Sequence, residues 1–211
     1  MATNLRGKRI LITAGPTWAP LDAVRVISNT ASGETGILLA QALAGRGARV
    51  TLMLGPVKAA YKNNSVRVIN FRFFDELRSL LKNELKKKRY AVIIHSAAVA
   101  DYAPSGPGRR KKISSGLKTL RLNLKPTPKI IDSLRKASPG SFLIGFKFEP
   151  DSQKNKLLAK ANRLMQRAGL DLIVANSIYK KKYSAYLISA EKHAGPFFSK
   201  QSMVKKLVNL I

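Results

Sequence analysis

Cysteine is absent from this sequence, and histidine occurs only twice, as His95 and His193. The lack of cysteine excludes disulfides and thiolate-bound metals. Because the two histidines lie far apart along the chain, a histidine-based metal site is not expected, and neither is a zinc enzyme. We therefore predict no metal ion held by the protein's own side chains.

Long apolar runs are also missing, since none reaches the roughly 18 residues that a membrane span requires. The first residues, Met1 to Lys8, lead directly into a strand-like segment without the apolar core of a signal peptide. We expect a soluble protein of a reducing compartment, the cytoplasm, with no membrane partner.

Acidic residues are scarce: 11 Asp and Glu stand against 39 Lys and Arg, a formal net charge of +28. Such an excess raises nucleic-acid binding as one interpretation. The basic runs are scattered, however, at 86–89, 109–112 and 180–182, as is typical of helix ends and solvated loops. Anionic substrates, phosphates above all, explain part of the remaining excess.

Two familiar phosphate-binding signatures are missing as well. The first strand-like segment is not followed by G-x-G-x-x-G, and no G-x-x-x-x-G-K-[ST] occurs anywhere. A Tyr-x-x-x-Lys pair is also absent after the fourth strand-like segment. These absences argue against an NAD(P)-dependent oxidoreductase and against a P-loop enzyme.

Hydrophobic residues make up 45% of the 211 residues, enough for a sizeable core. Short apolar runs alternate with stretches of helical period, which indicates a mostly parallel sheet with crossover helices. We predict an α/β Rossmann-like three-layer sandwich with a small additional strand region toward the C-terminus. A single domain over residues 1–211 fits this pattern best.

The predicted strands and helices follow from these runs. Strands are expected at 8–13, 49–54, 66–71, 90–95, 142–148, 170–175 and 184–189, with an exposed strand at 120–124. Helices are expected at 36–45, 74–88, 154–168 and 199–210, and another begins near Pro128, because proline favours the first helical position. A surface loop is expected at 102–116.

Three stretches rich in small residues are expected at the carboxyl ends of the strands: 14–17 follows the first strand, 29–36 leads into the first helix, and 96–102 follows the fourth strand. Ligands bind beyond the carboxyl ends of strands in open parallel sheets. Glycines before a helix let backbone N–H groups approach a phosphate. The sequence therefore favours a phosphate near the first helix, although Gly33 and Gly36 equally suit turns and close packing.

Four polar residues near these ends each have two interpretations. Asp101 suits a ribose or a magnesium ion, or else caps a turn. Asn29 suits a substrate hydrogen bond or a left-handed turn. Arg25 suits an anion or is surface charge, and His95 suits a core histidine better than a catalyst.

Taken in order, the motifs resemble one family. Residues Gly7 to Val57 contain ITAGPT, LDAVR, ISN, SGETG and TLMLGPV, and residues 96–102 read SAAVADY. Beyond them come Lys112-Ile113, Pro126-Thr127-Pro128, Gly145-Phe146 with Glu149, and DLIVAN at 171–176. This ordered set is similar to the phosphopantothenate–cysteine ligase (phosphopantothenoylcysteine synthetase) family, and covers nearly the whole chain. A flavin-dependent decarboxylase, often fused to this domain in bacteria, is not part of the sequence.

The resemblance implies a ligase of coenzyme A biosynthesis. Its partners are 4'-phosphopantothenate, cysteine and a nucleoside triphosphate, CTP or ATP, with Mg²⁺. The nucleotide activates the pantothenate carboxylate as an acyl-nucleotidylate, and the cysteine amine then forms the amide. The family also implies a homodimer with each site near the subunit interface, to which we expect residues 184–189 to contribute.

Site residues follow by the same resemblance. Asn29 matches the asparagine that holds the acyl-nucleotidylate, Lys112 the first lysine of a mobile loop, and Arg25 an arginine close to the substrate. These three are the catalytic candidates. The candidates for binding nucleotide and phosphate are Gly15, Ser32, Gly33, Ala97, Asp101, Lys112, Pro128, Lys129, Ile130, Ile131 and Phe146.

The chain departs from the family pattern at several positions. Trp18-Ala19 replaces an Arg-Glu pair, and Lys129 replaces an aspartate. Ala31 and Glu34 stand where serine and lysine are usual, and Leu164 and Ala168 stand where bacterial members have triphosphate-binding lysines. Neighbouring cations at 160, 163 and 167 lie at helical spacing and are our hypothetical substitutes. The alternative function is a module with a degraded site that binds nucleic acid through its basic surface.

Overall fold

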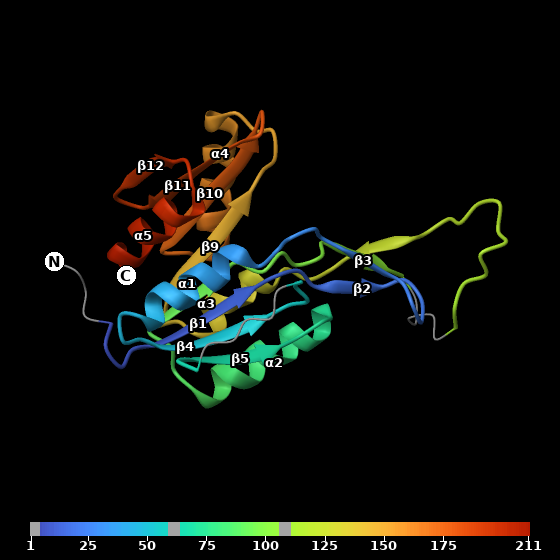
Figure 1. The fold of residues 1–211 in the computed structure, drawn as a ribbon, viewed down its shortest axis with the longest axis horizontal. Coiled ribbons are helices and arrows are strands. Elements are labelled where there is room, and N and C mark those ends of the chain that lie inside the picture. The colour runs from blue at the N-terminus through green and yellow to red at the C-terminus, as the bar shows by residue number, and fades with distance from the viewer. Residues whose placement is uncertain (1–4, 59–63, 106–110) are drawn as a thin grey trace.

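The computed structural model describes residues 5–58, 64–105 and 111–211. Within these residues an eight-stranded sheet has the order β12-β11-β10-β9-β6-β1-β4-β5 (Figure 1). Strands β5 to β10 of that order pair in parallel, whereas β11 and β12 pair antiparallel. The strands are β1 (Arg9–Ala14), β4 (Arg49–Leu54), β5 (Val66–Asn70), β6 (Val92–His95), β9 (Phe142–Phe148), β10 (Leu172–Tyr179), β11 (Lys182–Ser189) and β12 (His193–Phe197).

Helices cover both faces of this sheet. One core cluster joins the sheet to α1 (Glu34–Ala44) and α5 (Lys200–Leu210). The other joins it to α2 (Phe74–Lys87), α3 (Ile130–Ala137) and α4 (Lys154–Ala168). Side chains alternate along a strand, so Ile10 and Ile12 of β1 enter the first cluster and Leu11 enters the second. The predicted three-layer α/β sandwich, with extra strands toward the C-terminus, is confirmed.

Several elements differ from those predicted. The long segment after β1 contains a hairpin of β2 (Trp18–Pro20) and β3 (Val26–Ser28). A second pair joins β7 (Tyr102–Pro104) to β8 (Leu124–Pro126), so the strand predicted at 120–124 starts only at Leu124. Part of the predicted loop at 102–116 lies outside the described residues. Strand β12 was missed because its sequence, HAGPF, contains the glycine and proline typical of loops.

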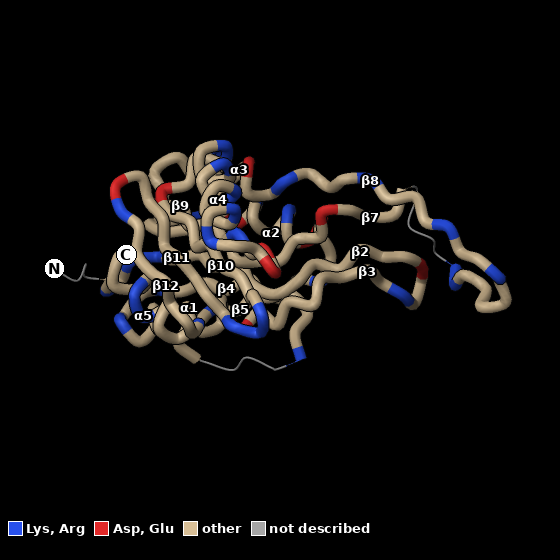
Figure 2. Tube along the Cα trace, turned by 90° about the horizontal axis from the view of Figure 1, so that it is seen from above, with Lys and Arg blue, Asp and Glu red and all other residues tan. Residues whose placement is uncertain are grey.

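The two small strand pairs extend together away from the sheet (Figures 1 and 2). We call this projection the arm and define it as residues 18–28, 102–105 and 111–126. Strands β2 and β7 contact each other within it. Its surface carries large exposed apolar side chains: Val24, Tyr102, Leu117, Leu120, Leu122 and Leu124.

The start of α1 lies unusually close to the end of β1. A Cβ atom on Gly36 would come within 2.3 Å of the Cβ of Ala14 and within 3.0 Å of the Oγ of Ser96. Gly15 and Gly33 have positive φ angles of +78° and +73°, which other residues adopt only with strain. The turn and packing roles considered for these glycines are therefore real, and they set where the first helix begins.

No helix among the described residues is both long and apolar enough to cross a membrane.

Gly36→Ala is expected to lower the free energy of unfolding by about 1–3 kcal/mol, because the added methyl group overpacks the α1–β1 contact. Gly140→Ala is the matched control, since a Cβ there meets nothing within 4 Å. Urea denaturation of both variants checks this. Equal free energies of unfolding for the two variants would show that α1 shifts to accommodate the methyl group without loss of stability.

Candidate functional site

Two cavities open beyond the carboxyl ends of the parallel strands and share one wall. The first has a volume of about 740 Å³ and the second of about 510 Å³. Ser96 and Ala98, which follow β6, line both, and so do Phe146 and Phe148 of β9. Ligands bound in the two cavities would therefore meet at this common wall.

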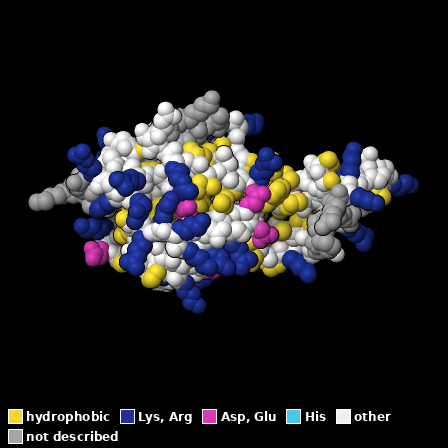
Figure 3. Space-filling model, turned by 90° about the horizontal axis from the view of Figure 1, so that it is seen from below, with side chains coloured by type: hydrophobic (Ala, Val, Ile, Leu, Met, Phe, Trp, Pro, Cys, Tyr) yellow, Lys and Arg dark blue, Asp and Glu magenta, His cyan; other side chains and the backbone are white. Residues whose placement is uncertain are grey.

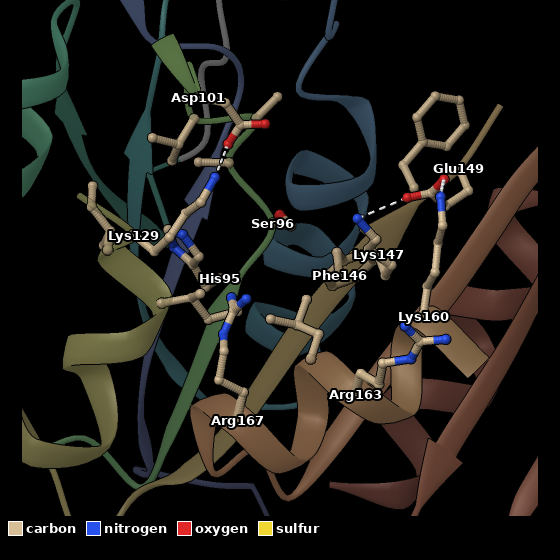
Figure 4. A pocket seen from close by; sticks show the side chains of 17 residues that line it. His95, Ser96, Asp101, Lys129, Phe146, Lys147, Glu149, Lys160, Arg163 and Arg167 are labelled. Carbon is tan, nitrogen blue, oxygen red and sulfur yellow. Dashed lines mark hydrogen bonds and ion pairs between the residues drawn. The ribbon is translucent and has the colours of Figure 1, made fainter. Parts of the chain in front are cut away.

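The first cavity is lined by cations from three elements (Figure 4). Lys147 comes from β9 and Lys129 immediately precedes α3. Lys160, Arg163 and Arg167 lie on α4 at spacings of three and four residues, so they share one helix face. This concentration of positive charge suits a polyanion.

Carboxylates hold most of these cations in place. The Nζ of Lys147 is 2.8 Å from Glu149, which also pairs with Lys160. Burial alone would raise the pKa of Glu149, but hydrogen bonds from these two lysines outweigh it and lower the pKa. Arg167 lies 3.1 Å from Asp132.

Arg163 differs from its neighbours on α4. Across residues 5–58, 64–105 and 111–211, no carboxylate lies within ion-pair distance of its guanidinium. It nevertheless lines the first cavity (Figure 4). Its charge is thus available to a ligand without breaking an existing pair.

His95 lies at the base of the first cavity, at the end of β6. Its side chain is buried, with 7% of the residue exposed, and its Nδ1 is 2.8 Å from the Oγ1 of Thr13. Burial lowers the pKa of His95 to about 4, so the imidazole is neutral at pH 7. The interpretation of His95 as a core histidine is confirmed.

Asp101 lies at the rim of the first cavity, where the side chain is 65% exposed and pairs with Lys129. Both residues were predicted binding residues, and the substitution of lysine for the family aspartate creates this pair. The Asp101 carboxylate contacts a lysine here rather than the backbone N–H groups that a turn cap would engage.

The second cavity surrounds the N-terminus of α1. Gly15, Ser32 and Gly33 line it, so its wall is formed by backbone and small side chains. Asn29 also lines it and donates from Nδ2 to the carbonyl oxygens of Ala98, at 3.0 Å, and Val99, at 3.3 Å. The loop before α1 is thereby joined to the loop after β6.

Asn29 is not among the described residues with positive φ, so its interpretation as a left-handed turn residue is wrong. Asn176 of β10 also lines the second cavity, and its Oδ1 is buried without a hydrogen-bond partner among the described residues. Asn176 was not a predicted site residue. It lies within the DLIVAN segment, which was the available signal.

Arg25 and Lys112 lie in the arm rather than at the cavities. The Arg25 guanidinium donates to Asp22, at 2.9 Å from Nε, and to the carbonyl of Ile113, at 2.8 Å. Asp22 in turn accepts from the backbone N–H of Ile113 at 3.0 Å. Arg25 is therefore neither free surface charge nor, in this chain alone, close to a ligand cavity.

The buried carboxylate of Asp22 was not predicted as a site residue. The hydrogen bond from Arg25, followed by that from Ile113, holds the pKa of Asp22 well below its usual range. Both backbone polar groups of Ile113 are thus fixed by one ion pair. Lys112 directly precedes Ile113 and is exposed, so the Asp22–Arg25 pair anchors the segment that carries it.

The remaining predicted binding residues divide between the cavities. Those that line the first are Ala97, Asp101, Lys129, Ile130, Ile131 and Phe146. Those that line the second are Gly15, Ser32, Gly33 and Phe146. Pro128 and Lys112 are not among the described residues that line either cavity. No described group of three or more metal-ligating side chains could hold a metal ion.

Comparison with known proteins identifies the family. Residues 5–211 match the model of the DNA/pantothenate metabolism flavoprotein C-terminal domain. The chain belongs to this family. The resemblance to phosphopantothenate–cysteine ligases drawn from the ordered motifs is thereby confirmed.

Relatives within the family share much of the chain. The coenzyme A biosynthesis bifunctional protein CoaBC of Thermococcus kodakarensis is 39% identical over 175 residues, which are 83% of this chain and 42% of that protein. The chain thus spans less than half the length of this relative.

Solved structures of the family have the same fold. The DNA/pantothenate metabolism flavoprotein from Streptococcus pneumoniae has a TM-score of 0.85 at 26% identity, covering 97% of this chain and 98% of that one. The C-terminal domain of a CoaBC protein has a TM-score of 0.79 at 25% identity, covering 99% and 96%.

Asp22→Ala is expected to speed tryptic cleavage after Lys112 at least about tenfold, because loss of a buried charge partner frees both Ile113 backbone groups. Asp75→Ala, which removes an exposed carboxylate from α2, is the control. Mass spectrometry of limited digests identifies the cleavage site. An unchanged rate at Lys112 would mean that other contacts hold the segment.

Proposed function

We propose that this domain joins 4'-phosphopantothenate to cysteine through an acyl-nucleotidylate formed from CTP or ATP, as a step of coenzyme A biosynthesis. The observation that carries the proposal is the wall shared by the two cavities. A triphosphate in the cationic first cavity and a phosphorylated carboxylic acid in the second would bring their reacting groups together at Ser96, Ala98 and Phe146. Membership of the family supports the same reaction.

The first cavity suits the nucleotide. Ala97, Asp101 and the start of α3 line it and would contact the nucleoside, and the α4 cations line the same space. Of the two positions that carry lysine in bacterial members, Leu164 lines the cavity without a charge, and Ala168 does not line it. The hypothetical substitutes Lys160, Arg163 and Arg167 do line the cavity. Magnesium fits this arrangement as an ion held mainly by the triphosphate oxygens.

The second cavity suits phosphopantothenate. Backbone N–H groups at the start of α1 favour a phosphate, aided by the helix dipole. With the phosphate there, the carboxylate end extends toward the common wall. Asn29 lies at this junction, fixed by the carbonyls of Ala98 and Val99.

The chemistry then requires positioning and charge stabilisation rather than covalent catalysis. A carboxylate oxygen of phosphopantothenate attacks the α-phosphorus, and the bond to pyrophosphate breaks. The cysteine amine next attacks the acyl carbon, the nucleoside monophosphate leaves, and the amine releases a proton. The cations of the first cavity offset the negative charge that develops in the first step.

The direct test supplies purified protein with phosphopantothenate, cysteine, magnesium and either CTP or ATP. Pyrophosphate release that depends on phosphopantothenate supports the ligase. The alternative, nucleic-acid binding, is favoured by the lysine and arginine side chains spread over the face in Figure 3. If neither nucleotide gives pyrophosphate release and the protein binds DNA tightly in a salt-sensitive way, that alternative is supported.

Arg163→Gln is expected to raise the nucleotide KM about tenfold, since a charge-assisted hydrogen bond to phosphate contributes about 1.5–3 kcal/mol. Lys156→Gln is the control, because Lys156 is exposed on α4 and does not line the cavity. Initial rates at varied CTP or ATP provide the measurement. A KM matching the control would remove Arg163 from the triphosphate site.

The arm supports a homodimer. It exposes large apolar side chains that a partner would cover. It extends away from the sheet (Figure 2), and its residues Arg25 and Lys112 line neither cavity of their own chain. We infer that the arm of each protomer completes the site of the other. The expected contribution of residues 184–189, which belong to β11, stays a prediction.

Mixed dimers test this arrangement. Asn29→Asp and Lys112→Gln are each expected to reduce turnover strongly while the fold stays intact. When the two variants are unfolded and refolded together, about a quarter of wild-type turnover should return, because a symmetric exchange leaves one intact site in half of the dimers. Each variant refolded alone is the control. No recovery in dimers shown to be mixed would place Lys112 in the site of its own chain.

A further inference from the structure

The second cavity contains one ion pair that the proposed reaction does not yet use. Among the described residues, Glu34 and Lys200 are the charged side chains that line it. They come from opposite ends of the chain: Glu34 opens α1, Lys200 opens α5, and their side chains are paired. Neither residue was a predicted site residue.

The position of Lys200 is fixed by its helix. Ser199 caps α5 by accepting from the N–H of Ser202 at 3.1 Å. The buried face of the helix, with Met203 and Leu207, packs into the same core cluster as α1. The lysine backbone is therefore rigid, and only the side chain, 32% exposed, has freedom to move.

Glu34 is unfavourable for an anionic ligand. A carboxylate in the first turn of a helix interacts well with the helix dipole, but it occupies the end at which a phosphate would bind. Tyr183 adds no second negative charge, because burial, with a smaller effect of Glu34, raises its pKa to about 12. The cavity thus has a net charge near zero while Lys200 stays paired.

We propose that Lys200 binds the phosphate of phosphopantothenate, and that Glu34 holds the ammonium group at the cavity until the phosphate replaces it. This inference rests on the proposed function, since it names the group that recognises the substrate's phosphate. In the free site the lysine has one anionic partner. In the occupied site the dianionic phosphate is the stronger partner, and Glu34 turns toward solvent, to which it is already partly exposed.

Two substitutions that break the same ion pair distinguish a binding role from a structural one. If the pair only ties α5 to α1, Lys200→Ala and Glu34→Gln should have similar effects. If Lys200 binds phosphate, their effects have opposite signs. Lys200→Ala should raise the KM for phosphopantothenate about tenfold or more. Glu34→Gln should lower that KM severalfold, because the lysine no longer has to leave a carboxylate.

Further variants complete the experiment. Lys205→Ala removes an exposed charge from α5 and should leave both KM values at their wild-type level. Lys200→Arg should recover most of the affinity. The nucleotide KM should stay constant in every variant, since Lys200 does not line the first cavity. Equal changes in Lys200→Ala and Lys205→Ala, or changes of the same sign in Lys200→Ala and Glu34→Gln, would overturn the proposal.

A binding measurement separates this inference from the proposed function. Calorimetric titration with inorganic phosphate and with phosphopantothenate needs no catalysis. Loss of phosphate affinity in Lys200→Ala, in a protein without ligase activity, would support the phosphate site while rejecting the ligase. If the wild-type protein is an active ligase but binds both probes as weakly as Lys200→Ala does, Lys200 has no role in phosphate recognition.

Discussion

The contact between α1 and β1 sets the geometry on which the site depends. Because Gly36 has no side chain, the helix reaches the end of the strand, and its first turn lies beside Ser96 of the loop after β6. Gly15 and Gly33 supply the backbone conformations that lead the chain into this approach. A bulkier residue would push the helix outward and widen the second cavity. The same movement of α1 would shift the second cavity away from the wall that it shares with the first cavity.

Charge in this molecule is organised around that geometry. The chain has few carboxylates, yet those at the cavities pair with cations that line them: Glu149 with Lys147 and Lys160, Asp132 with Arg167, Asp101 with Lys129, and Glu34 with Lys200. Exposed pairs of this kind add little stability. Their effect is to keep flexible side chains at the ligand-facing surface. A net charge of +28 therefore does not by itself describe the sites, where positive charge is held in defined positions.

The layers could be predicted well because buried strands such as 49–54 and 90–95 are mostly apolar, as is typical of strands covered on both faces of a parallel sheet. Prediction failed for β2, β3 and β7, which are only three residues long and too short to show an alternating pattern, and for β12, whose glycine and proline are typical of loops. The rule that ligands bind beyond the carboxyl ends of parallel strands likewise pointed to Gly15, Asn29 and Asp101, which line the cavities. Asp22, Lys200 and Asn176 were missed because their roles arise from contacts across tens of residues. The only local signal for Asp22 was its spacing of three residues before Arg25.

Phe146 and Phe148 form part of the boundary of both cavities. Where ligands in the two cavities would meet, these side chains present aromatic carbon, which does not hold solvent as polar groups do. In the proposed reaction, these rings would limit the access of water to an acyl-nucleotidylate before an amine arrives. Dry surroundings also strengthen each charge interaction with the leaving group. If the proposed reaction holds, two aromatic residues of a single strand would favour amide formation over loss of the activated acid to water.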